Sequence, residues 1–453
     1  VAGSTMKDSA YDLLCAVLLG VGNMCMFLGY DTQTTIVEPV LHSVHDRSPD
    51  IINQHAGYHG VATLLFTFTF SSFLAPWTLG MLGSKWSILL GSMLFSFHLG
   101  SFLYIHYVPY YLTSALLGMG YSLFYSGHGA YITEHSTKRT IERNSALSWS
   151  LATSSLVLGG FVLILTAQPP AEVDTLVYST NETKVGNEAK SYRQYSDYEI
   201  RLMYGAFAAV SIVANIIFAF LPTRPVGNSI AQPVNRKNRV GFTEHLRSVL
   251  CTLVSSRALL AAPVYLFLGV STAFWITIYP TTLIFSKRLS EIPYLQAYYV
   301  IVFGVGEMAM GATISIVSKY VHNFAKMPSM IIGSILYFTA LILSLLSTPS
   351  DATNTPSDAP TMLLAPSLEL SLLIGFLLGL ADNAFNTSRT VLCSMLIPDR
   401  ISHVFAISKF HQVRIFAMSI FTFLSPMISM PLHFTANFIF GFLAIFSYYF
   451  AVR

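Results

Sequence analysis

Long apolar runs, separated by short polar segments, follow one another along the whole chain. Each run is about 20 residues long, the length of helix that crosses a hydrocarbon core of about 30 Å. Gly, Pro and single polar residues interrupt several runs, which membrane helices tolerate when their neighbours satisfy the backbone. The pattern predicts an all-α, polytopic membrane protein with twelve transmembrane helices. We place these helices at 12–32, 58–80, 86–106, 109–132, 146–167, 201–222, 259–284, 295–318, 328–348, 368–391, 403–425 and 433–452.

Composition strengthens this prediction. Hydrophobic residues make up 53% of the chain and charged residues only 10%, whereas ordinary soluble proteins carry roughly 25% charged residues. A soluble chain with so few charges would have too little polar surface to face water, so we expect its main partner to be the lipid bilayer. The net charge is only +3, and the chain contains no basic run interleaved with aromatic residues. Nucleic-acid binding is therefore excluded.

The sequence also argues against enzymatic chemistry. It contains no nucleotide-binding loop, no catalytic triad and no metal-ligating cluster, so we predict neither an enzyme nor a bound cofactor or metal. Three of the four cysteines, Cys15, Cys25 and Cys393, lie in apolar runs, and Cys251 lies in a connecting segment. This placement favours neither a disulfide framework nor a zinc site.

A polar connector at 223–257 divides the chain into two parts of similar size. We expect an N-terminal six-helix bundle at 1–222 and a C-terminal six-helix bundle at 258–453. The second part of the connector, "GFTEHLRSVLCTLVSSR", places apolar side chains on one helical face and polar ones opposite, which is typical of a helix lying on the inner membrane surface. We interpret this helix as a structural strap between the bundles; a regulatory docking helix is the alternative.

The distribution of basic residues predicts the orientation. Most of the 25 lysines and arginines fall on one side if both termini are cytosolic, as the positive-inside rule requires. The loop 168–199 is then external, and its sequon Asn181-Glu182-Thr183 makes Asn181 a predicted glycosylation site. No cleavable signal peptide precedes the first run, so we expect that run to act as its own insertion signal. Either the plasma membrane or an endomembrane fits this topology.

A weak internal repeat relates the two halves. "LLGMG" at 116–120, followed by Phe124, matches "LLGLA" at 377–381, followed by Phe385. The two segments lie six predicted helices apart. Weak similarity between two six-helix halves is typical of the major facilitator architecture, which binds its substrate between the halves near the bilayer midplane. We therefore expect two pseudo-symmetric bundles with the functional site between them.

Polar and charged residues inside the apolar runs are the candidates for that site. An ionised group at the bilayer centre costs about 2.5–3.5 kcal/mol on insertion scales, so it should face the bundle interior or a water-filled cavity. Asp382, Asn386 and Arg389 are spaced i, i+4 and i+7 and share one helical face. We expect Asp382 to pair with Lys409 or Arg414 on the next helix, either as a structural pair or as a coupling or substrate site. The full candidate set is Asp31, His128, Glu307, Asp382, Asn383, Asn386, Arg389, Lys409 and Arg414.

Two of these candidates need separate consideration. Glu307 lies in "VFGVGEMAMGA", where a desolvated, protonated carboxyl could serve proton coupling; the alternative is a hydrogen bond to a neighbouring helix. His128 lies in "YSGHGAYIT" and could titrate near neutral pH, although a packing or hydrogen-bonding role is the simpler reading.

One sequence feature counts against the best-known porters of the major facilitator superfamily. Sugar and drug porters carry Gly-x-x-x-Asp-Arg/Lys-x-Gly-Arg/Lys between their second and third helices. The corresponding stretch here, "GMLGSKWSI", keeps Gly80 and Lys85, but Ser84 replaces the acidic residue and Ser87 the glycine. The charge latch between the two bundles is therefore incomplete.

Several further stretches resemble the Unc-93-like family, a divergent branch of the major facilitator superfamily. The resemblance covers nearly the whole chain and is greatest to the family's short, orphan transporter-like members. Glu307, Asp382, Asn386 and Lys409 match the family pattern, whereas His128 stands where the family usually has Gln. The matching stretches are "FYSGHGAYIT" (124–133), "ERNSALSWSLATSSLVLGG" (142–160), "FGVGEMAMG" (303–311), "PSDAP" (356–360), "LLGLADNAFNTS" (377–388) and "FAISKFHQV" (405–413).

The resemblance implies a role in partner binding. The best-known worm member regulates a two-pore-domain potassium channel, and a vertebrate member escorts nucleic-acid-sensing Toll-like receptors to endosomes. We therefore expect an accessory or trafficking partner of another integral membrane protein, such as a channel or receptor. The alternative is a proton- or sodium-coupled transporter of a small solute that uses the polar face of the helix at 368–391.

Overall fold

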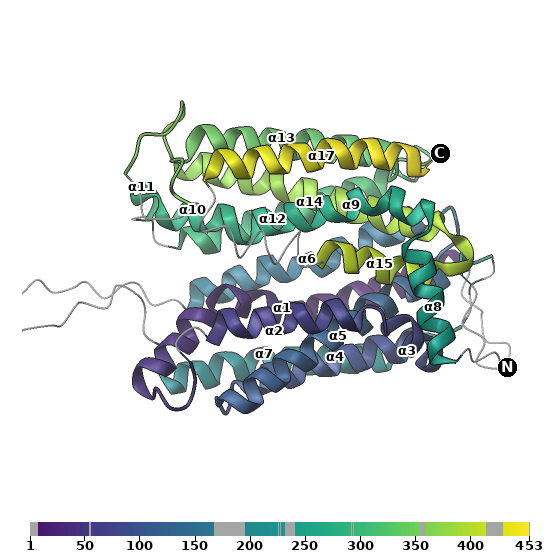
Figure 1. The fold of residues 1–453 in the computed structure, drawn as a ribbon, viewed down its shortest axis with the longest axis horizontal. Coiled ribbons are helices and arrows are strands. Elements are labelled where there is room, and N and C mark those ends of the chain that lie inside the picture. The colour runs from purple at the N-terminus through teal and green to yellow at the C-terminus, as the bar shows by residue number, and fades with distance from the viewer. Residues whose placement is uncertain are drawn as a thin grey trace, which may run out of the picture.

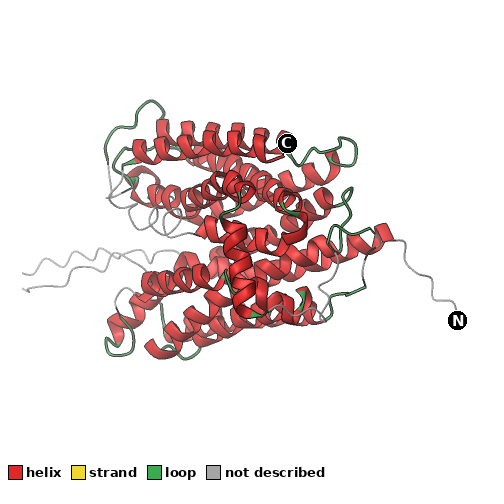
Figure 2. Cartoon of the chain, turned by 45° about the vertical axis from the view of Figure 1, so that its right-hand side comes forward, coloured by secondary structure: helices red, strands yellow, loops and turns green. Residues whose placement is uncertain are grey.

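The structure is a computed structural model that describes residues 8–53, 56–166, 195–224, 226, 228–231, 241–290, 292, 294–353, 358–413 and 429–452. Helices dominate these residues, and they contain no strand beyond an isolated bridge between Thr137 and Ser229 (Figure 2). Two predicted residues, Asn181 and Arg414, lie outside the described ranges.

The first part of the chain forms seven helices. They are α1 (Asp8–Arg47), α2 (Ala56–Ser71), α3 (Ala75–Leu82), α4 (Ser84–Ser101), α5 (Tyr107–Glu134), α6 (Ile141–Thr166) and α7 (Asp197–Ala219). Helices α2 and α3 meet at a bend of 67°. Pro76 is the second residue of α3 and lies in the first helical turn, where the missing N–H of proline costs no helical hydrogen bond.

The second part begins with the short helix α8 (Phe242–Leu253). The helices that follow are α9 (Ser256–Ala273), α10 (Tyr279–Phe285), α11 (Lys287–Ser290), α12 (Leu295–Val317), α13 (Met327–Ser347), α14 (Leu368–Leu396), α15 (Ile401–Val413) and α17 (Met430–Val452). A π-helical turn, Phe274–Ile278, joins α9 to α10, and a 3-10 turn, Pro398–Arg400, precedes α15.

These helices correspond to the twelve predicted spans. Among the described residues, eight helical segments are long and apolar enough to cross a membrane, and the bent pair α2–α3 makes a ninth. The remaining predicted spans correspond to α4, α5 and the described part of α15. Many of the Ser, Thr and His side chains of α5 are buried, so its polar residues face other helices rather than lipid.

The helices lie side by side in two groups (Figure 1). Helices α1 to α7 form one group and α9, α12, α13, α14, α15 and α17 the other, with α6 and α15 where the two groups meet. A large apolar core joins buried residues between Ala261 and Tyr448, and two smaller cores lie within the first group. The division into units at 1–222 and 258–453 stays a prediction.

Small residues allow the two groups to approach closely where α6 meets α12. A Cβ atom on Gly304 would lie 2.8 Å from Val157 Cγ2, and one on Gly311 would lie 2.5 Å from Ser150 Cβ. Ser150 Oγ also donates a hydrogen bond to the carbonyl oxygen of Met308 at 3.0 Å. Helices α6 and α12 therefore pack closely, and α12 lies at the contact between the two groups.

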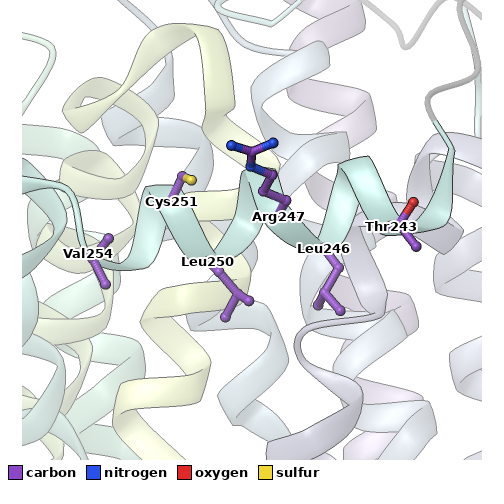
Figure 3. Close-up of a pocket in the computed structure, with 6 residues that line it drawn as sticks. All are labelled: Thr243, Leu246, Arg247, Leu250, Cys251 and Val254. Carbon is purple, nitrogen blue, oxygen red and sulfur yellow. The ribbon is translucent and has the colours of Figure 1, made fainter.

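Helix α8 crosses one end of the bundle, where it contacts α3 of the first group and α9 and α15 of the second (Figure 1). We call this the α8 end. The helix lies within the predicted amphipathic segment, and Leu246, Leu250 and Val254 line a pocket along it together with Thr243, Arg247 and Cys251 (Figure 3). The first described residue of α1 and the last of α17 lie at the same end, as expected if both termini share one side.

Candidate functional site

Two carboxyl groups meet where α12 packs on α14. Glu307 of α12 and Asp382 of α14 are both buried, at 1% and 6% exposure, and their carboxyls lie close enough to interact directly. Glycines make this contact possible: a Cβ on Gly379 would lie 2.0 Å from the carbonyl oxygen of Phe303, and one on Gly306 would lie 2.4 Å from that of Phe376. We call Glu307 and Asp382 the acid pair.

Asp382 has further partners that fix its position. Trp275 Nε1 donates to its Oδ1 at 3.1 Å, and Asn386 Nδ2 donates to its Oδ2 at 2.7 Å. The indole of Trp275 stacks on Phe303 of α12, with ring centroids 4.0 Å apart. Asp382 and Asn386 thus share one face of α14, as their spacing predicts.

The acid pair holds at least one proton. Two carboxylates in contact repel each other strongly, and burial removes the water that would otherwise screen them, so both cannot be ionised together. Asp31 of α1 lies close enough for its charge to act on Glu307. Its Oδ2 accepts a hydrogen bond from Ser155 of α6 at 3.2 Å. The structure therefore brings together three of the predicted acidic candidates, one from α1, one from α12 and one from α14.

Of the two basic partners predicted for Asp382, Lys409 forms no ion pair with it, and Arg414 lies outside the described residues. Lys409 Nζ instead donates to Gln412 Oε1 at 2.8 Å and lies 3.9 Å from the ring centroid of Tyr125 on α5. Asp382 already accepts hydrogen bonds from Trp275 and Asn386, and the side chain of Lys409 turns towards α5. Sequence spacing could not reveal this, because it does not give the rotation of α15 about its own axis.

Arg389 of α14, Lys409 of α15 and His128 of α5 form a second set of candidates. Arg389 Nη1 donates to Ser408 Oγ at 3.3 Å, and the charges of Arg389 and Lys409 both act on the ring of His128 in α5. Asn383 lies on another side of α14, where its Oδ1 accepts from Thr387 at 3.3 Å. His128 therefore belongs with the basic residues rather than with the acid pair.

A group of contacts at the α8 end was missed by sequence reasoning. Arg143 forms an ion pair with Asp12 at 2.8 Å. Glu142 Oε2 accepts from the backbone N–H of Ala325, which connects α6 of the first group to the segment between α12 and α13. The only sequence signal was the charge of "ERN" at the start of α6. The bond from Ala325 to Glu142 joins the two groups at that end, and the Arg143–Asp12 pair fixes α6 on α1 beside it.

Ser84, which stands where porters carry an acidic residue, also has a partner at the α8 end. Its hydroxyl donates to Glu134 Oε2 at 2.5 Å, so the acidic partner of this contact comes from the end of α5. The neighbouring residue His135 stacks on Tyr131, with centroids 4.0 Å apart. Burial lowers the pKa of His135 by penalising its charged form, so this ring is neutral at pH 7.

No group of three or more His, Cys, Asp or Glu side chains in the described part of the chain is arranged to hold a metal ion. The charged groups that the described part of the site brings together are the carboxyls of the acid pair and the cationic side chains of Arg389 and Lys409.

Comparison with solved structures defines the class of protein. The chain resembles a crystal structure of FucP, described as a major facilitator superfamily transporter in the outward conformation, with a TM-score of 0.63 and 13% identity, covering 98% of this chain and 100% of that one. It also resembles XylE, described as a proton:xylose symporter bound to 6-bromo-6-deoxy-D-glucose, with a TM-score of 0.64 and 12% identity, covering 98% and 95% of the two chains. The protein is therefore a multi-pass integral membrane protein with the major facilitator fold.

Sequence comparison then gives the family. Residues 48–449 match the family model described as "Ion channel regulatory protein UNC-93", so the chain belongs to the UNC-93 family. Among its relatives are the UNC93-like protein MFSD11 of Xenopus laevis, 24% identical over 90% of this chain and 89% of that protein, and the same protein of Xenopus tropicalis, with the same identity and coverage. The family resemblance predicted from the sequence is confirmed.

Proposed function

We propose that this protein is a proton-coupled secondary transporter of a small solute and that the acid pair is its proton-binding site. The observation that carries the proposal is the contact between the buried carboxyls of Glu307 and Asp382. A buried acidic residue inside a membrane protein is costly, and such residues commonly serve proton relays in transporters.

The position of the acid pair suits coupling. Glu307 lies on α12, which packs on α6 of the first group of helices, whereas Asp382 lies on α14. In alternating access one half of the fold rocks against the other around a central site. A movement of α12 along α6 would change the distance from the acid pair to Asp31 of α1, whose charge acts on Glu307, and with it the pair's hold on the shared proton.

Two structural neighbours support this proposal by their described activities. XylE is described as a proton:xylose symporter, and a FucP variant is described as a fucose:proton symporter. Their identity to this chain is too low to carry over a substrate. Proton coupling at the acid pair rests on the residues of this chain.

The proposal is tested with purified protein in proteoliposomes. Uptake from a panel of small solutes should depend on an inward proton gradient and should be lost in Asp382→Asn and Glu307→Gln. The matched control is Asp197→Asn, which removes an exposed carboxyl at the N-terminus of α7. Uptake that ignores the gradient, or that survives both substitutions, would refute the proposal.

A second candidate function is an accessory or trafficking partner of another integral membrane protein, such as a potassium channel or a receptor. It is favoured by the family description as an ion channel regulatory protein and was the first expectation from the sequence. The carboxyl contact bears directly on transport, so we place transport first. Affinity purification from native membranes separates the two: a stoichiometric channel or receptor supports the accessory role, and a monomer active in liposomes supports transport.

We further propose that both termini are cytosolic, which places the α8 end on the cytosolic side, and that Asn181 is glycosylated on the opposite side. The plasma membrane and an endomembrane both suit this arrangement.

A further inference from the structure

We infer that Arg389 and Lys409 form a binding site for a small anionic solute that carries a carboxylate or phosphate group. This inference deepens the proposed function by naming the substrate class, and it rests on that function. We call Arg389 and Lys409 the basic pair.

Arg389 is buried without an acidic partner among the described residues. Its side chain is 3% exposed, and its Nη1 donates to the neutral hydroxyl of Ser408. Its Nε has no hydrogen-bond partner among the described residues. A guanidinium presents its N–H groups as a planar fork that matches carboxylate and phosphate oxygens. One arm of that fork is thus unused.

Lys409 is in the same condition. It is 6% exposed, and the partners that the structure gives its ammonium are the neutral oxygen of Gln412 and the ring face of Tyr125. The like charge of Arg389 acts on it more strongly than the opposite charge of Asp382. Two like charges are therefore buried close together.

No carboxylate among the described residues lies within ion-pair distance of either member of the basic pair. Seven residues separate Asp382 from Arg389 along α14, which corresponds to about 10 Å of helix rise. The charge of Asp382 does act on Lys409, but from beyond ion-pair distance. The segment 414–429, which follows Lys409 in the chain, contains no Asp or Glu. Leaving buried charges uncompensated is strongly unfavourable, so an anion from solution is the group that fits.

The site lies between the two groups of helices. Arg389 and Lys409 belong to α14 and α15, whereas Tyr125 and His128 belong to α5 of the first group. A Cβ on Gly129 would lie 2.5 Å from the ring of Phe405, so α5 and α15 are in direct contact here. The Nε2 atom of His128 is buried without a described partner and is a further group for an anion to meet. Such a ligand would contact both groups, as a transported substrate must.

The charge of the site also favours an anionic ligand over a neutral sugar. A neutral sugar would supply hydroxyl groups but no charge, so the basic pair would stay uncompensated. A carboxylate or phosphate supplies the charge and accepts several N–H bonds together, and bonds of this kind are the stronger ones.

Binding is tested directly, without transport. The full-length protein, purified in a neutral detergent, is melted in the presence of lactate, succinate or inorganic phosphate, with chloride at equal ionic strength and glucose as controls. At least one of the three oxyanions should raise the melting temperature above both controls. Its affinity should fall by about tenfold or more in Arg389→Gln and in Lys409→Gln. Arg47→Gln, which alters an exposed arginine that pairs with Asp197, should bind as the wild type does.

Unliganded stability provides a second measurement. If the basic pair is a ligand-binding site, Lys409→Gln removes the repulsion between Lys409 and Arg389 in the unliganded protein. The unliganded variant should then melt no lower than the wild type. A purely structural pair would give the opposite result, a loss of stability without any change in anion binding. That result would overturn the inference.

Three outcomes of the binding experiment would also overturn it: no stabilisation by any oxyanion, equal stabilisation by chloride, or stabilisation only by phosphatidylglycerol in nanodiscs. The last outcome would assign the basic pair to a lipid headgroup. Proton-driven uptake that persists without oxyanion binding would leave the proposed function standing while refuting this inference. Conversely, oxyanion binding without proton dependence would refute the proposed function alone.

Discussion

Gly379 lies at the tight contact between α14 and α12, beside the acid pair. It faces the backbone of α12 one turn before Glu307, so a Cβ at this position would lie 2.0 Å from the carbonyl oxygen of Phe303 and 3.1 Å from the backbone nitrogen of Glu307. Ordinary van der Waals contact begins near 3.4 Å. The substitution Gly379→Ala therefore requires α12 and α14 to separate by about 1.4 Å at this point.

The cost can be worked out from this overlap. Overpacking a tight core costs about 1–3 kcal/mol, and the upper end applies because a backbone carbonyl cannot rotate away as a side chain can. Alanine is about 1 kcal/mol better than glycine inside a helix. We expect a net destabilisation of about 2 kcal/mol. The same separation would pull Glu307 away from Asp382, so proton-driven uptake should fall as well.

The assay is thermal melting of the purified protein in detergent, together with proton-driven uptake in liposomes. Gly100→Ala is the matched control, since a Cβ at Gly100, near the end of α4, would meet nothing within 4 Å. Gly100→Ala should be neutral or slightly stabilising. If Gly379→Ala melts as high as this control and keeps its uptake, then the close packing of α12 on α14 does not position the acid pair.

Three further predictions follow from other contacts. Arg143→Ala should destabilise the protein by about 3 kcal/mol in thermal melting, because it leaves the buried carboxylate of Asp12 without its ionic partner. Trp275→Phe should keep the ring stacking but lose the N–H bond to Asp382, which costs about 1.5–3 kcal/mol for a charged acceptor and should lower proton-driven uptake by about tenfold or more. Cys251 is the one exposed cysteine among the four, so a membrane-impermeant maleimide should label it in intact membranes only from the cytosolic side.

A specific result would refute each of these three predictions. For the ion pair, Arg47→Ala breaks the exposed contact with Asp197 and should cost only about 0–1 kcal/mol; equal losses in the two variants would mean that burial of Asp12 is not the cause. Uptake by Trp275→Phe equal to that of the wild type would show that the indole serves packing alone. Labelling of Cys251 from outside intact cells would invert the proposed orientation.

Much of the fold could be predicted from the sequence. The apolar runs gave the positions of the spans because each helix in a bilayer must satisfy its own backbone hydrogen bonds, which makes length and hydropathy nearly sufficient. The bend between α2 and α3 and the π-helical turn after α9 were not predicted. Both depend on how neighbouring helices pack rather than on local composition.

The candidate site could be predicted in part. The cost of burying charge marked out Glu307, Asp382, Arg389 and Lys409, because a polar group in an apolar run needs a partner inside the protein. Of the partners predicted for Asp382, Lys409 was wrong, and Arg414 lies outside the described residues. Charge alone favoured a basic partner on the next helix, whereas the structure gives this residue an indole, an amide and a second carboxyl.

The sequence by itself thus determined the class of protein, the approximate place of each span and which residues must face inward, since all three follow from transfer free energies along one chain. Only the tertiary structure decided that two acids meet on α12 and α14 while two bases lie together near α5. That sorting depends on the rotation and close approach of helices distant in sequence, which glycines such as Gly379 permit. No periodicity along a single helix records such contacts.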